Sequence, residues 1–187
     1  MLKSISISPV VRAILVIGAV AALVTGVTFA ALESEATLTQ NTIAGEDALQ
    51  VNNDPEGNAT FSQTEQGFNF INIVPGVASS QTENFELRNT STTTVDVNVQ
   101  IPTPPTLPAG VTGEDITFTF EAVGGGGPVT ATWTDLITGD GVLLFTGLVG
   151  GTDQEFTVKV DVAGTVTTDS VDIDPFTLLF GVPVTTP

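Results

Sequence analysis

Apolar and polar residues alternate along several stretches in the second half of the chain. The pattern is clearest in Thr94–Ile101, Asp115–Ala122 and Gln154–Val162, where apolar residues recur at every second position. A period of two is typical of a β-strand with one face on a core and the other in water. Val129, Ala131 and Trp133 alternate with threonines in the same way, which predicts a further strand and places Trp133 in the core.

Weaker strand patterns surround these four and are separated by turn residues. They cover Ala36–Ile43, Ala48–Asn52, Phe68–Val74, Asn84–Asn89, Val142–Thr146 and Ser170–Phe180. Gly124–Pro128 is typical of a hairpin loop, and Pro102–Pro108 of an extended crossover. Many short strands without a helical period predict an all-β fold: an antiparallel, jelly-roll-like β-sandwich that forms a single domain over residues 31–187.

An uncharged, mostly apolar run, Ala13–Leu32, precedes the predicted strands. Its length is close to the roughly 20 residues that a membrane-spanning helix needs. The small residues Thr28 and Ala30 flank Phe29, which predicts signal cleavage before Ala31. Residues 1–30 are therefore expected to form a hydrophobic helix, as either a cleaved signal peptide or a retained membrane anchor. Both alternatives place the rest of the chain outside the cytoplasm, because the basic residues precede the run.

Composition narrows the functional classes. The chain of 187 residues has no His and no Cys, which excludes zinc sites built on these residues, Ser–His and Cys nucleophiles, and disulfides. All 21 acidic residues lie from Glu33 onward, where only Arg88 and Lys159 are basic, so this region carries a formal charge of −19. Such acidity argues against nucleic acid as a partner. We expect a protein that binds or assembles, not an enzyme.

The acidic residues are the remaining candidates for chemistry. Most are expected to form a solvated surface, and no pair stands out as a glycosidase acid and base. Calcium is the one cofactor that stays open, because hard cations prefer clustered oxygen ligands. The candidates for a calcium site are Asp54 and Glu56 in one loop, and Asp169, Asp172 and Asp174 in one acidic strand. Asn58 and Asn89 begin glycan-acceptor triplets, which chance explains in a chain this rich in Asn and Thr.

Two regions resemble the TasA/camelysin family of secreted biofilm-matrix fibre proteins, whose members carry a SipW-type signal peptide. The first runs from a small-aromatic-small cleavage region through a polar segment and a Gly to a short apolar strand. Its residues are Gly26–Leu32, Ser34–Leu38, Asn41–Gly45 and Ala48–Val51. The second has a Pro-Gly turn, a strand that ends in Asn and a small polar turn into the next strand. Its residues are Asn72–Gly76, Phe85–Asn89, Ser91–Thr92 and Val95–Val99.

The resemblance covers roughly residues 24–101, with two departures. The leader lacks a basic cluster, and Gly45 is followed by Glu46 and Asp47 where the family has a small polar residue and Leu. The family includes members described as metalloproteases, an activity that does not carry over because this chain has no His. The resemblance implies a secreted subunit that polymerises head to tail with copies of itself. In the family, the segment after the cleavage site inserts into the next subunit's sheet.

Residues 31–43 are the corresponding donor-strand candidate, with Ala36, Leu38 and Ile43 as its apolar residues. Two alternatives stay open. An archaeal-type pilin would keep its hydrophobic N-terminal helix, and Ser8–Val11 resembles the start of such a helix. A membrane-anchored adhesive or surface module would not polymerise at all. Because subunits of charge −19 repel one another, we expect salt, calcium or acid to promote assembly.

Overall fold

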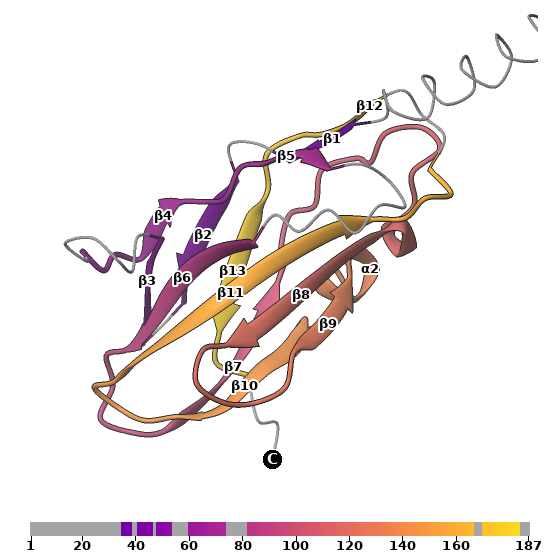
Figure 1. The fold of residues 1–187 in the computed structure, drawn as a ribbon. Coiled ribbons are helices and arrows are strands. Elements are labelled where there is room, and N and C mark those ends of the chain that lie inside the picture. The colour runs from indigo at the N-terminus through magenta and orange to yellow at the C-terminus, as the bar shows by residue number, and fades with distance from the viewer. Residues whose placement is uncertain are drawn as a thin grey trace, which may run out of the picture.

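The computed structural model describes residues 35–38, 41–46, 48–53, 60–73, 82–166 and 170–183 (Figure 1). Within these ranges none of the helices is long and apolar enough to cross a membrane. The residues form thirteen strands, a 3-10 turn η1 and a helical turn α2. Their bounds are β1 Glu35–Leu38, β2 Thr42–Gly45, β3 Leu49–Asn52, β4 Thr64–Gln66, β5 Phe70–Ile73, β6 Thr82–Asn89, β7 Val95–Gln100, η1 Gly113–Asp115, β8 Ile116–Ala122, β9 Val129–Thr132, α2 Trp133–Leu136, β10 Val142–Leu148, β11 Asp153–Val162, β12 Ser170–Ile173 and β13 Thr177–Gly181.

Two five-stranded sheets make up most of the fold. One has the strand order β10-β7-β13-β2-β4, and the other β3-β6-β11-β8-β9. The ring of Phe85 on β6 lies 4.9 Å from that of Phe180 on β13, and Phe145 on β10 lies 5.7 Å from Phe156 on β11. The two sheets therefore face each other across a shared hydrophobic core, which confirms the all-β prediction.

The alternating stretches form the strands that line this core. β11 pairs antiparallel with β6 on one side and β8 on the other, and Phe156, Val158 and Val160 are completely buried. The prediction was wrong at Asn98, which belongs to the polar face of the β7 alternation. Asn98 is buried between Val97 and Val99, because the loop that contains Asp140 covers this part of the face and accepts a hydrogen bond from its amide.

Trp133 is a core residue as predicted, but it does not belong to a strand. β9 ends at Thr132, and Trp133 opens the helical turn α2. The side chains of Thr132 and Asp135 form a reciprocal capping box around this turn, which satisfies two backbone N–H groups and ends the strand. Trp133 is 1% exposed and packs against Phe176 with ring centroids 4.9 Å apart.

The two predicted loops connect strands as expected. Pro102–Pro108 lies in the connection from β7 in one sheet to β8 in the other, so it crosses between the layers. Gly124–Pro128 joins β8 to its antiparallel neighbour β9 as a hairpin loop. Gly124 and Gly126 have positive φ angles of 91° and 87°, a conformation that residues with a side chain rarely adopt.

A third sheet of order β12-β1-β5 continues three strands of the first one. β1 and β2, β4 and β5, and β12 and β13 are successive parts of three chain segments, and each segment keeps the same neighbours in both sheets. The predicted strands Ala36–Ile43 and Ser170–Phe180 are therefore each divided in two. The three segments form one interrupted ribbon, whose β12-β1-β5 part projects at one end of the molecule (Figure 1).

Candidate functional site

The N-terminal segment occupies the middle of this three-segment ribbon. β1 pairs parallel with β12 and antiparallel with β5, and β2 pairs parallel with β13 and antiparallel with β4. In this register Ala36 lies opposite Val171, Leu38 opposite Ile173 and Ile43 opposite Leu178. These are the only parallel pairings among the described strands, and the sequence did not predict them. The donor-strand candidate thus completes a sheet of its own chain from a central position.

Asn41 holds the ribbon together where its strands are interrupted. Its Nδ2 donates a hydrogen bond of 3.1 Å to the main-chain oxygen of Phe68, and its Oδ1 accepts one of 3.3 Å from the main-chain N–H of Phe176. The main-chain oxygen of Asn41 also accepts a hydrogen bond from Gly67 N–H. Asn41 is only 2% exposed, so these bonds are formed inside the fold. They satisfy backbone groups that do not take part in the strand pairing.

A tight turn joins the N-terminal segment to the rest of the domain. The N–H of Leu49 donates to the main-chain oxygen of Glu46 at 3.0 Å. A Cβ atom on Gly45 would lie 2.3 Å from the main-chain oxygen of Leu49, so the turn closes only with glycine at this position. In the sequence Asn41 and Gly45 stand out only as parts of the resemblance, which does not indicate these roles. The partners of Asn41 are 27 and 135 residues away, and no local pattern reveals them.

Several residues singled out by the sequence lie outside the described ranges. They are the cleavage residues Thr28, Ala30 and Ala31 and the calcium candidates Asp54, Glu56 and Asp169. Asp172 on β12 and Asp174 after it are described, and both are exposed. In the described ranges, groups of three or more His, Cys, Asp or Glu side chains that could hold a metal ion are absent.

The two basic residues that follow the leader are both engaged with acids. Arg88 binds Asp153 through two hydrogen bonds of 2.7 Å and lies 3.7 Å from the ring centre of Phe61. The hydrogen bonds with Asp153 raise the pKa of Arg88. The Lys159 ammonium lies 2.8 Å from a carboxylate oxygen of Asp161. The basic charges are thus matched locally, and the described surface is left with an excess of acids.

Two acids stabilise turns of the backbone. The Asp115 carboxylate accepts hydrogen bonds from the hydroxyl and the N–H of Thr112 and from the Thr165 hydroxyl, and the Thr112 bonds lower its pKa. The Asp135 pKa is lowered in the same way by the N–H and hydroxyl of Thr132. Both carboxylates act as caps, so their role is structural.

Asn89, which begins one of the two glycan-acceptor triplets, is completely buried. Its Nδ2, the atom to which a glycan would be attached, donates to the main-chain oxygens of Thr93 at 2.8 Å and Leu148 at 2.9 Å. In this fold Asn89 is a structural residue and is not open to modification. Asn58, in the other triplet, lies outside the described residues.

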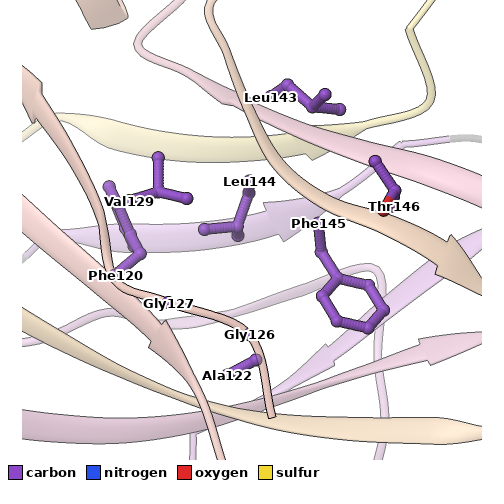
Figure 2. A pocket seen from close by; sticks show the side chains of 9 residues that line it. All are labelled: Phe120, Ala122, Gly126, Gly127, Val129, Leu143, Leu144, Phe145 and Thr146. Atoms are coloured by element: carbon purple, nitrogen blue, oxygen red, sulfur yellow. The ribbon is translucent and has the colours of Figure 1, made fainter.

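A pocket of about 300 Å³ opens between the edges of the two facing sheets (Figure 2). Phe120 and Ala122 on β8 and Val129 on β9 line one side, and the β10 residues Leu143–Thr146 line the other. Gly126 and Gly127 form part of the rim without adding side chains. Apart from the Thr146 hydroxyl, the lining side chains are apolar, so they supply no acid, base or charged ligand.

Comparison with known proteins adds no assignment. The chain matches no family model, no curated protein and no solved structure.

Proposed function

We propose that the protein is a secreted structural subunit that polymerises into extracellular fibres by donating its N-terminal strand to the next subunit. The observation that supports this most strongly is the central position of Glu35–Gly45. On both edges the segment pairs with strands that lie later in the sequence, β4 and β5 on one side and β12 and β13 on the other. Without it, two inner strand edges lose their partners.

The same segment of a second copy would pair with these two strand edges equally well. Strand addition supplies main-chain hydrogen bonds to open edges, and alternate side chains supply specificity. Among the described residues, the segment is followed by the turn that the bond from Leu49 N–H to Glu46 O closes, so its release requires this turn to open and its pairings with the neighbouring strands to break. Each subunit would then donate its N-terminal segment to the next subunit and accept the segment of the previous one. A head-to-tail exchange of this kind produces an open filament.

The finer architecture belongs to the same proposal. We regard the facing sheets as a jelly-roll-like sandwich whose ribbon is completed by the donated strand. Residues 1–30 are taken as the export signal, with cleavage between Ala30 and Ala31, so that Ala31–Ile43 is released at the new N-terminus. Outside the cell the subunit would have other copies of itself as partners, in a homopolymer. It would be associated with the membrane only before cleavage.

Imaging of the secreted protein together with its N-terminal sequence tests the proposal. Fibres composed of chains that begin near Ala31 would support strand donation. Filaments whose chains begin before Pro9 would favour the pilin alternative, because the hydrophobic helix is then retained. A secreted chain that stays monomeric at high concentration and high salt would contradict polymerisation. The alternative of a surface module that does not polymerise would then remain.

A further inference from the structure

The buried amide of Asn98 has an oxygen without a partner. Asn98 is 6% exposed, and its Nδ2 donates to the main-chain oxygen of Asp140. A main-chain oxygen only accepts hydrogen bonds, so this contact fixes which end of the amide carries the oxygen. Among the described residues nothing donates a hydrogen bond to Asn98 Oδ1. A buried oxygen without a hydrogen-bond partner is destabilising, so it calls for a ligand.

The Asn98 oxygen faces a space beside Gly181. Gly181 on β13 is the register partner of Asn98 on β7. A Cβ atom on Gly181 would lie 3.1 Å from Asn98 Oδ1 and also 3.1 Å from Glu46 Oε2. Because position 181 has no side chain, the two oxygens converge on the same space. The main-chain N–H of Glu46 donates to Phe180 at 2.9 Å, which fixes the Glu46 backbone next to β13.

We propose that this space binds a divalent cation, with Asn98 Oδ1 and the Glu46 carboxylate as ligands. Both are hard oxygen ligands, one neutral and one charged, which is the chemistry that calcium and magnesium select. Nitrogen and sulfur ligands, which favour zinc and copper, do not contribute to the pair. Calcium fits better than magnesium because it accepts irregular geometry and a mixture of amide, carboxylate and water oxygens.

The site differs from the calcium candidates that the sequence suggested. Its ligands come from residues 46 and 98, which are joined only through the pairing of β7 with β13 and the contact of Glu46 with β13. Glu46 is exposed, so the ion reaches the site from solvent. With a single charged ligand we expect weak binding, with a Kd of about 10⁻⁴–10⁻³ M, as in other extracellular calcium modules.

The test is a calcium titration of the full chain by calorimetry, together with the melting temperature followed by Trp133 fluorescence. We expect saturable binding and a higher melting temperature in calcium than in sodium chloride of equal ionic strength. Glu46→Gln should weaken binding about tenfold, because it removes the charged ligand. Gly181→Ala should abolish binding, because its Cβ atom occupies the space.

Glu121→Gln is the matched control: it removes the same charge from an exposed residue on β8, and it should bind calcium like the wild type. The proposal is overturned if the wild-type chain does not bind calcium, or if Glu46→Gln and Glu121→Gln bind it equally. If Gly181→Ala does not fold, the comparison of the two glutamine variants decides. Glu46→Gln and Glu121→Gln remove the same charge, so a difference between them reports the site itself and is separate from any effect of calcium on fibre formation.

Discussion

Asn41 shows how one side chain bridges the interruption in the ribbon. It replaces ladder hydrogen bonds with side-chain bonds to Phe68 on one neighbouring segment and to Phe176 on the other. The cost of removing such a residue is dominated by the backbone groups that it leaves unpaired, because they stay buried without water. We therefore treat Asn41 as the residue on which the central position of the N-terminal segment depends most.

Replacing Asn41 with alanine should lower the free energy of unfolding by about 2–4 kcal/mol, because one buried acceptor and one buried donor lose their partners. Urea unfolding followed by Trp133 fluorescence measures this. Asn84→Ala, at an exposed position on β6, is the matched control and should change the free energy by less than about 0.5 kcal/mol. Equal effects of the two variants would contradict the role given to Asn41.

The capping acid Asp115 predicts a pH dependence. Its pKa is lower in the folded chain than in the unfolded one, so its contribution to stability is complete above the unfolded value of about 3.9 and is lost as the pH falls below it. Asp115→Asn should therefore lose less stability than the wild type between about pH 5 and pH 2.5. The urea midpoint at both pH values measures this. If the midpoint falls between these pH values by the same amount in the variant as in the wild type, the prediction is refuted.

Among the secondary-structure elements, local sequence patterns were enough to predict each strand that has one face on the core. The alternation of Phe118 with threonines and of Val158 with polar residues predicted β8 and β11 closely, because burial on one face imposes the period. β4, with the sequence Thr64-Glu65-Gln66, has no such alternation and was missed. The α2 turn was also missed, although the Thr132–Asp135 capping box is a local signal that could have found it.

The candidate site was predictable only in part. The resemblance suggested residues 31–43 as a donor-strand candidate, but it did not reveal where the segment lies or that it runs parallel to β12 and β13. Asn41 and Asn98 look alike in the sequence, as polar residues within strands. Their roles depend on Phe176 in one case and on Gly181 in the other, contacts that only the folded chain creates.

At the scale of the whole molecule, charge constrains how subunits associate. The two basic side chains of the described domain are paired with Asp153 and Asp161, so they do not offset the other acids. Neighbouring subunits in the proposed filament would therefore repel each other, and salt would screen this repulsion over a Debye length of about 8 Å at physiological ionic strength.

We expect the chain that begins at Ala31 to polymerise faster at 0.5 M than at 0.01 M sodium chloride, since the Debye length falls from about 30 Å to less than 8 Å. Light scattering over time measures the rate, and acidification to about pH 4 at low salt should have the same effect by protonating carboxylates. Polymerisation that is equally fast in low-salt, neutral buffer with a chelator would count against charge repulsion as a barrier.

Strand donation requires β1 and β2 to leave their own sheet and complete that of a neighbour. The chain has no cysteine, so a single introduced pair can lock the segment. Thr42 on β2 and Thr177 on β13 are register partners, and neighbouring strands lie about 4.8 Å apart, within the range that a disulfide spans. The control pair is Thr119 on β8 and Thr130 on β9, which are also register partners but do not touch the segment.

The most direct measurement is therefore fibre formation, by electron microscopy and sedimentation, of T42C/T177C and T119C/T130C with and without reductant. We predict that oxidised T42C/T177C stays monomeric and forms fibres after reduction, whereas T119C/T130C forms fibres in both states. Fibres from oxidised T42C/T177C with an intact intramolecular disulfide would contradict it, because the segment would then assemble without leaving its own sheet.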